Sequence, residues 1–218
     1  MKIEDQVRYY QERAKEYDLV YEKPERQVDL CKLKTYLPTK FEAKHTLEIA
    51  CGTGYWTKSI AKAALSVSAI DINESVLEIA KTRLKNQVNV TLSQSDYQNL
   101  SQLKVKYDAL FGGFIWSHIP LEQLENFLSI CLNAVKPYGI AVFIDNRYIE
   151  GNSTPICRVD DMGNSYQIRK LQSGATFEVI KNYPTVSSVR ELLKDAAFQI
   201  SWKELEYYWI LEITKHEI

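Results

Sequence analysis

The 218-residue sequence lacks a long apolar run, an excess of either charge and any close pair of cysteines. No stretch approaches the roughly 18–20 apolar residues of a membrane span, and Met1-Lys2-Ile3-Glu4-Asp5 does not begin a secretion signal. The 27 Lys and Arg against 28 Asp and Glu give a net charge of −1, with no run of five basic residues. We therefore expect neither a membrane protein nor a nucleic-acid-binding protein.

The four cysteines are Cys31, Cys51, Cys131 and Cys157, and they contain no Cys-x-x-Cys pair. Isolated thiols are typical of a reducing compartment, so we expect a cytoplasmic protein without a metal site. The surplus in this composition is aromatic, with 14 Tyr, 4 Trp and 7 Phe. The length fits a single domain spanning residues 1–218, large enough for a sheet with helices on both faces.

The stretch from Thr46 to Trp56 joins a short apolar run to a glycine turn and a helical pattern. Leu47 and Ile49 predict a buried strand, and Gly52 and Gly54 predict a turn without Cβ atoms on its inner side. A strand, a glycine turn and a helix N-terminus present backbone N–H groups to a ligand at close range. This pattern indicates a nucleotide-type binding turn.

Strand and helix patterns then alternate as far as residue 145. Strands are expected at 66–71, 88–92, 107–111 and 140–145, helices at 55–64, 74–85 and 121–134, and a turn at Lys136-Pro137-Tyr138-Gly139. Such alternation implies right-handed crossovers and a parallel sheet, so the fold class is α/β and doubly wound.

Residues 1–40 predict a helical cap. A helix is expected at 3–20, and a second one follows Pro24 and ends at Pro38. The first helix either packs on the domain with half-buried tyrosines or closes as a lid over a ligand.

The segment 146–182 predicts an excursion on the substrate side. A loop at 146–164 precedes a β-hairpin of strands 166–171 and 176–180, closed at Ser173-Gly174. A helix at 185–195 and two antiparallel strands at the sheet edge, at 198–204 and 207–214, complete the chain.

Three features decide which nucleotide the turn would bind. A dinucleotide site expects a third glycine where Thr57 stands, and bulky Trp56 would crowd a pyrophosphate, which disfavours an NAD-dependent dehydrogenase. Asp71 ends the second strand, where it could accept hydrogen bonds from ribose hydroxyls; alternatively it caps the next helix, although Asn73 is better placed to do so. Asp96 and Tyr97 end the third strand and offer an acceptor and a ring face that suit adenine.

The run Glu48-Ile49-Ala50-Cys51-Gly52-Thr53-Gly54, with Asp71, Asp96-Tyr97 and Phe114-Ile115-Trp116-Ser117-His118-Ile119-Pro120, resembles the motif series of class I S-adenosylmethionine-dependent methyltransferases over about residues 45–145. The resemblance implies a Rossmann-like seven-stranded sheet whose last strand is antiparallel, and S-adenosylmethionine as cofactor. It implies that Glu48 and the turn from Ala50 to Gly54 hold the methionine part, Asp71 the ribose, Asp96 with Tyr97 the adenine, and Gly113 with Phe114 the sulfonium.

Further predicted cofactor contacts are Trp56 beside the turn and Ile72 beside Asp71. The opening Tyr9-Tyr10-x-x-Arg13-Ala14-x-x-Tyr17-Asp18 resembles the N-terminal cap of small-molecule methyltransferases. The resemblance implies that Tyr10, Arg13 or Tyr17 engages the cofactor carboxylate.

His118 is the candidate catalytic residue. Methyl transfer from a sulfonium mainly requires alignment and exclusion of water, so a general base is optional. A histidine just past the cofactor loop could act as that base or orient an acceptor. Alternatively, it caps the helix opened by Pro120.

The predicted acceptor-binding residues lie where segments drape over the sheet edge: Trp116, His118, Asn146, Arg147, Tyr148 and Tyr208. For Arg147 the alternative is a salt bridge to Asp145 or Glu150. The aromatic surplus suits a flat or cationic acceptor, such as an amine or guanidine. We expect methyl transfer to N or O of a small molecule by a monomer or homodimer; the alternative is a non-catalytic nucleotide-binding module that partners another enzyme.

Overall fold

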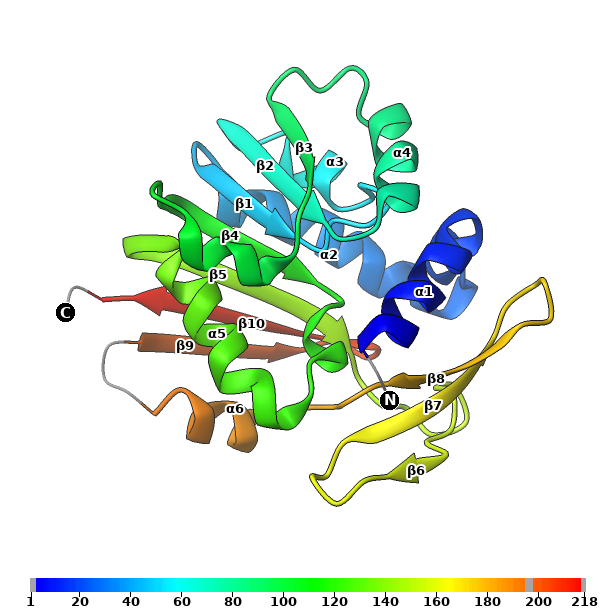
Figure 1. Cartoon of the computed structure of the whole chain (residues 1–218). Helices are drawn as coiled ribbons and strands as arrows, with labels where there is room; N and C mark the ends of the chain where they lie inside the picture. Colours follow the sequence, from blue (N-terminus) through cyan, green and yellow to red (C-terminus); the bar gives the residue numbers. More distant parts are fainter. Residues whose placement is uncertain (1–2, 195–197, 217–218) are drawn as a thin grey trace.

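A computed structural model describes residues 3–194 and 198–216, and its centre is a seven-stranded sheet of order β3-β2-β1-β4-β5-β10-β9 (Figure 1). The strands are β1 (His45–Ile49), β2 (Ser66–Asp71), β3 (Val90–Gln94), β4 (Tyr107–Gly113), β5 (Val135–Asn146), β9 (Phe198–Glu204) and β10 (Tyr208–Lys215). Strands β1 to β5 pair in parallel, and β10 runs antiparallel between β5 and β9. The predicted doubly wound sheet is confirmed, with the last strand inside the sheet and β9 at its edge.

Helices cover both faces of this sheet and bury its central strands. One face carries α2 (Gln27–Phe41), α3 (Thr57–Ile60) and α4 (Glu74–Arg83); the other carries the 3₁₀ helix η3 (Tyr97–Gln102), α5 (Leu124–Asn133) and α6 (Val186–Leu192). Side chains alternate along each strand. Leu47 and Ile49 therefore join the core under α5, whereas Ala109 and Phe111 join the core under α2.

The N-terminal segment lies over the carboxyl ends of the strands. It comprises α1 (Ile3–Arg13) and the 3₁₀ helices η1 (Ala14–Tyr21) and η2 (Pro24–Arg26), so the predicted helix 3–20 changes type after Arg13. Asp18 forms an ion pair with Arg83 of α4 and accepts a hydrogen bond from Thr53 Oγ1 at 2.6 Å. These contacts attach η1 to the glycine turn.

A second, three-stranded antiparallel sheet stands apart from the first, below α1 in Figure 1. It consists of β6 (Arg158–Val159), which the sequence did not predict, β7 (Ser165–Lys170) and β8 (Thr176–Ile180). Gly174 in the connecting turn has φ +89°, as the predicted closure at Ser173-Gly174 requires. Tyr9 of α1 packs against Leu171 and Val179, so the hairpin and α1 cover the sheet edge together.

Pro38 does not end its helix, contrary to the sequence prediction. It lies inside α2, which continues to Phe41. A proline in a helix removes the N–H that would bond the carbonyl four residues earlier. Here the Ser59 hydroxyl donates to the Lys34 carbonyl at 3.4 Å and occupies that acceptor.

Three other predicted boundaries differ from the structure. The helix expected at 55–64 is a regular α-helix only over 57–60. The turn expected at 136–139 is an irregularity within β5, where the register with β4 shifts and Tyr138 has φ +60°. The helix expected at 185–195 is α6, and residue 195 lies outside the described residues. Within residues 3–194 and 198–216, the helices are too short or too polar to cross a membrane.

Candidate functional site

The glycine turn after β1 has a left-handed backbone at Ala50, Gly52 and Gly54, with φ of +50°, +54° and +74°. A Cβ atom on Gly52 would meet nothing within 4 Å, so this residue faces open space. A Cβ atom on Gly54 would lie 2.9 Å from Leu84 Cδ1, so Gly54 instead permits close packing of α4. The two glycines therefore serve different purposes.

Asp71 ends β2 beside this turn. Its Oδ2 accepts a hydrogen bond from the Gly52 N–H at 2.9 Å, and its Oδ1 accepts one from the Asn73 N–H at 2.9 Å. Burial raises the pKa of this carboxyl group. Asn73, not Asp71, occupies the N-cap position of α4. Because a carboxylate oxygen can accept more than one bond, Asp71 keeps acceptor capacity for a ligand.

Two overlapping cavities, of about 390 and 150 Å³, lie along this sheet edge and share seven residues, among them Asp71, Ile72, Ile115 and His118. We call their union the acidic cleft. Among the described residues that line it, the charged ones are all acids: Asp71, Asp96, Glu122 and Asp160.

Asp96 and Tyr97 line the larger part of the acidic cleft. Asp96 Oδ1 accepts the Gln98 N–H at 2.9 Å and caps η3. The Tyr97 ring packs edge-on against Phe127 at 5.0 Å. The smaller part is lined by Gly52, Gly113 and Phe114. The structure therefore brings together the residues that the sequence assigned to adenine, ribose and sulfonium.

A third cavity, of about 180 Å³, opens between the N-terminal segment, the end of β5 and the hairpin. We call it the cationic cavity, because its described lining contains no Asp or Glu and includes five Lys and Arg: Arg13, Lys23, Arg26, Arg169 and Lys181. The predicted acceptor residues Asn146 and Tyr208 also line it.

Four side chains line both the cationic cavity and the acidic cleft: Tyr10, Tyr17, Phe114 and His118. We call this group the junction. Phe114 follows β4 with φ +62°, and its ring lies 6.0 Å from that of Tyr21. Tyr10 and Tyr17 come from the N-terminal segment, with ring centroids 6.0 Å apart. The junction is therefore aromatic and closed by the N-terminal segment.

His118 is held by hydrogen bonds at both ring nitrogens. Its Nδ1 donates to the Ile180 carbonyl at 2.7 Å, so Nε2 accepts from the Tyr10 hydroxyl, at 2.5 Å. Burial and the nearby Lys181 lower the pKa of His118 to about 3. The side chain thus bonds the hairpin and α1 and does not cap the helix after Pro120. Its basic nitrogen is already occupied by Tyr10.

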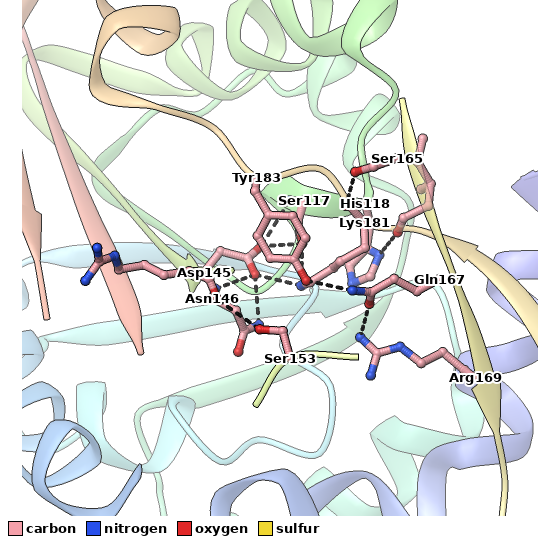
Figure 2. Close-up of polar contacts among 12 residues, drawn as sticks. Ser117, His118, Asp145, Asn146, Ser153, Ser165, Gln167, Arg169, Lys181 and Tyr183 are labelled. Carbon is pink, nitrogen blue, oxygen red and sulfur yellow. Dashed lines mark hydrogen bonds and ion pairs between the residues drawn. The ribbon is translucent and has the colours of Figure 1, made fainter. Parts of the chain in front are cut away.

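Behind His118 lies a buried ion pair, drawn in Figure 2. Lys181 Nζ is 2.8 Å from Asp145 Oδ1 and donates to Ser117 Oγ at 2.5 Å. Asp145 Oδ2 accepts from the Ser117 N–H at 3.0 Å and from its hydroxyl at 2.7 Å. Despite burial, Lys181 holds the pKa of Asp145 below its usual range, and burial lowers the pKa of Lys181.

Trp56 and Trp116, both predicted to contact ligands, line neither the acidic cleft nor the cationic cavity. Trp116 is fully buried against Phe143, at 5.3 Å between ring centroids. Trp56 is buried on the other face of the sheet, where its Nε1 donates to Tyr21 Oη at 3.2 Å. Both indole rings therefore pack into the hydrophobic core, although they lie next to the cofactor motifs in sequence.

Arg147 and Tyr148 also lie outside the cationic cavity. Arg147 pairs with Glu204 at 3.0 Å and donates to the Leu205 carbonyl at 2.6 Å, so neither Asp145 nor Glu150 is its partner. Tyr148 packs against Tyr183, which does line the cavity.

Glu48 is buried beneath the glycine turn and does not line the acidic cleft. Burial, with a smaller contribution from Asp71, raises the pKa of Glu48 to about 8. Its Oε2 has no hydrogen-bond partner among the described residues. This carboxyl group is therefore protonated near neutral pH and supports the turn from below.

Ten lining residues of the cationic cavity were not predicted from the sequence, among them four of its five cations, Lys23, Arg26, Arg169 and Lys181. Lys23 and Arg26 flank Pro24 and resemble ordinary surface charges. The one available signal was Lys181, which directly follows the apolar pair Val179 and Ile180 at a strand end.

Residues 46–139 match the model of a methyltransferase domain family. An uncharacterized methyltransferase of Oceanobacillus iheyensis is 25% identical over 172 residues, which cover 78% of this chain and 76% of that protein. A ubiquinone biosynthesis O-methyltransferase of Coxiella burnetii is 26% identical over 103 residues, 47% of this chain and 43% of that enzyme, so the match spans less than half of it.

Among solved structures, the complex of DhpI with SAM and HEP has a TM-score of 0.79 and 26% identity, covering 97% of this chain and 96% of DhpI. This match includes the N-terminal segment and the hairpin, which lie outside the matched family model. Together with the sheet order, these comparisons favour a methyltransferase over an NAD-dependent dehydrogenase. Residues 46–139 form a methyltransferase domain of the class I, S-adenosylmethionine-dependent type, with S-adenosylmethionine as its cofactor.

Proposed function

We propose that the enzyme transfers a methyl group from S-adenosylmethionine in the acidic cleft to N or O of a small molecule in the cationic cavity. The observation that carries this proposal is the junction, where Tyr10, Tyr17, Phe114 and His118 line both spaces. Methyl transfer requires the acceptor and the sulfonium to meet in line, and a shared wall of side chains provides such a meeting point.

The acidic cleft fits the cofactor in charge and shape. Its described charged lining is acidic, which suits a sulfonium cation, and the open side of Gly52 allows close approach to the backbone. We assign the ribose to Asp71, the adenine to Asp96 and Tyr97, and the cofactor carboxylate to Arg13 with Tyr10 or Tyr17. When bound, S-adenosylmethionine supplies an electrophilic methyl group with a neutral leaving group.

The protein's own contribution is alignment and exclusion of water. Residues 1–40 act as a cap and 146–182 as the acceptor side of one domain spanning 1–218. Tyr10 and Tyr17, from the N-terminal segment, close one side of the junction. Tyr10 bonds His118, and His118 in turn bonds the Ile180 carbonyl, so these two hydrogen bonds connect the N-terminal segment to the hairpin. In this arrangement His118 positions Tyr10 and the hairpin; it becomes a base only if Tyr10 releases Nε2.

The cationic lining bears on the choice of acceptor. The aromatic surplus indicated an amine or guanidine acceptor, but such a cation would be repelled by Arg13, Arg26 and Arg169. The quinone-pathway relatives, named for ubiquinone and demethylmenaquinone, support a small-molecule acceptor. A monomeric or homodimeric state and a cytoplasmic location stay predictions from the sequence.

Calorimetry with S-adenosylhomocysteine and with NAD tests the cofactor side. We expect the first to bind and the second not to bind. Methyl-transfer assays against a metabolite panel, followed by mass spectrometry of products heavier by one methyl group, test the acceptor side. Failure of S-adenosylhomocysteine to bind, or tighter binding of NAD, would contradict the proposed function.

A further inference from the structure

The cationic cavity carries a charge that the protein does not neutralise. Asp145 is the only carboxylate that bonds any of its five cations within the described part of the chain, and Asp145 is itself fully buried behind Lys181. Glu25, next to Arg26 in sequence, is exposed and accepts from Asn152 Nδ2 at 3.0 Å. Partly buried like charges repel one another unless an anion lies between them.

Two of the guanidinium groups have neutral partners. Arg26 Nη1 donates to Asn146 Oδ1 and Nη2 donates to Asn152 Oδ1, both at 2.9 Å. Arg169 Nη1 donates to Thr154 Oγ1 at 2.9 Å, and its Nη2 donates to Gln167 Oε1. Neutral amides and hydroxyls hold the planar groups in fixed orientations without cancelling their charge. Fixed guanidinium groups are the preferred ligands of planar or tetrahedral oxyanions.

Arg13 and Lys23 lack an acidic partner as well. The Arg13 guanidinium lies over the rings of Tyr9 and Tyr17, at 5.6 and 5.1 Å from their centroids. The Lys23 carbonyl accepts hydrogen bonds from Gln27 and Arg26, but within residues 3–194 and 198–216 its ammonium group has no hydrogen-bond or ion-pair partner. Burial lowers the pKa of Lys23; Arg26, Arg169 and Arg13 add to this shift, and the exposed Glu25 opposes it. If Arg13 binds the cofactor carboxylate, Lys23, Arg26 and Arg169 still have no anionic partner among the described residues.

No described lining residue of the cationic cavity is free to take a proton at neutral pH. The His118 Nε2 lone pair accepts from Tyr10, and the Lys181 ammonium is paired with Asp145. Burial raises the pKa of the Tyr10 hydroxyl, so it does not form a phenolate. An acceptor that must lose a proton during the reaction is therefore poorly served. An acceptor that is already anionic needs no base.

We propose that the methyl acceptor is a small oxyanion, a carboxylate or a phosphoryl group, held by Arg26, Arg169, Lys23 and Lys181 and methylated on its anionic oxygen. This inference rests on the proposed function and names its acceptor class. An oxygen lone pair forms the new O–CH₃ bond, and the electron pair of the broken C–S bond stays on sulfur. The oxyanion loses one negative charge, the sulfonium becomes a neutral thioether, and no proton moves.

The first test adds inorganic phosphate, as a probe of the anion site, to enzyme that is already saturated with S-adenosylhomocysteine. We expect calorimetry to detect phosphate binding, and Arg169→Gln to weaken it about tenfold or more, the usual effect of losing a charged hydrogen bond. The control is Arg158→Gln, since Arg158 lies outside the cavity and pairs with Glu178 at 2.7 Å. No phosphate binding, or equal weakening by both variants, would overturn the inference. Unchanged affinity for S-adenosylhomocysteine shows that the variants remain folded.

The second test is a panel of carboxylates, phosphate monoesters, phosphonates, phenols and amines, with methyl esters identified by mass spectrometry. We expect methyl ester formation from one oxyanion class, and Arg169→Gln to raise its KM about tenfold or more with little change in kcat. Comparison of the carboxylate and phosphoryl arms identifies the group. Faster turnover of a phenol or amine than of every oxyanion overturns this inference but leaves the proposed methyltransferase activity intact. Failure of S-adenosylhomocysteine to bind would instead remove both.

Discussion

The two spaces on either side of the junction differ in charge and in how the chain builds them. The acidic cleft is lined mainly by the ends of consecutive strands, between Ala50 and Gln123, and its described charged lining is acidic. The cationic cavity gathers residues from Tyr10 to Tyr208, and its described lining has five cations and no acid. Four side chains separate them. A positively charged cofactor and a negatively charged acceptor would thus be sorted to opposite sides before they react.

The two spaces also differ in the kind of interaction that holds their lining residues in place. Asp71 and Gly52 are fixed by backbone hydrogen bonds at strand ends, which the sheet itself supplies. The cationic cavity depends on side chains of the hairpin and on a buried ion pair between Lys181 and Asp145. We expect single substitutions to damage the second space more than the first, and the following experiments test this difference, from the largest expected effect to the smallest.

Lys181→Met should destabilise the protein at the cationic cavity. It leaves Asp145 buried without its cation, which typically costs about 3–5 kcal/mol in the free energy of unfolding. The double variant Lys181→Met with Asp145→Asn should recover part of this loss, because no unpaired charge remains. Chemical denaturation measures both, with Lys194→Met, in an exposed pair with Glu191, as control. A loss below about 1 kcal/mol for Lys181→Met would show that the ion pair does not support the cavity.

Asp71→Ala should affect the acidic cleft, with a smaller change in free energy than Lys181→Met causes in the cationic cavity. We expect it to weaken S-adenosylhomocysteine binding by about 1–3 kcal/mol, the scale of a lost charged hydrogen bond, with little loss of stability. Calorimetry measures the affinity, and Asp108→Ala, which removes a surface pair with Lys136, is the matched control. Unchanged affinity in a folded Asp71→Ala variant would refute the ribose assignment.

Glu48→Gln should change the pH dependence of stability. The pKa of Glu48 is raised to about 8 in the folded state, against about 4.5 when unfolded. The protonated carboxyl group therefore supports the free energy of unfolding fully below pH 4.5, and this support is lost as the pH rises towards and through 8. Between pH 7 and 9 the wild type should lose about 1–2 kcal/mol that Glu48→Gln keeps. Denaturation curves at the two pH values test this, and parallel losses in both proteins would contradict it.

His118→Asn should have the smallest effect. Because the pKa of His118 is lowered to about 3, the group stays neutral across pH 5–8 and the wild-type kcat/KM should show no ionisation near 6.5. Loss of its hydrogen bonds should cost about 1 kcal/mol in transition-state stabilisation without altering the pH profile. A wild-type inflection near pH 6.5 that disappears in the variant would make His118 a general base.

The sheet and the cofactor edge could be predicted because their signals are local. Glycines, a strand-ending Asp71 and the pair Asp96-Tyr97 each mark a strand end, and parallel strands bring their carboxyl ends to one edge. The irregular features could not be predicted so well. Pro38 lies inside α2, and the carbonyl that it leaves free accepts from Ser59, a residue distant in sequence.

The cationic cavity could not be predicted because nothing in the local sequence distinguishes its cations. Arg26 and Arg169 are separated by more than half of the chain, and their meeting depends on how the hairpin docks against Tyr9 of α1. The aromatic surplus pointed to a cationic acceptor, yet Trp56 and Trp116 pack into the core. Long-range packing, rather than composition, sets the charge of this space.

The most direct measurement is a crystal structure of the enzyme with S-adenosylhomocysteine bound. The ribose hydroxyls should lie against Asp71, the adenine beside Asp96 and Tyr97, and the sulfur at the junction, facing the cationic cavity between Tyr10, Tyr17, Phe114 and His118. An adenosyl group inside the cationic cavity, or a sulfur that faces away from it, would contradict the division of the two reactants between these spaces.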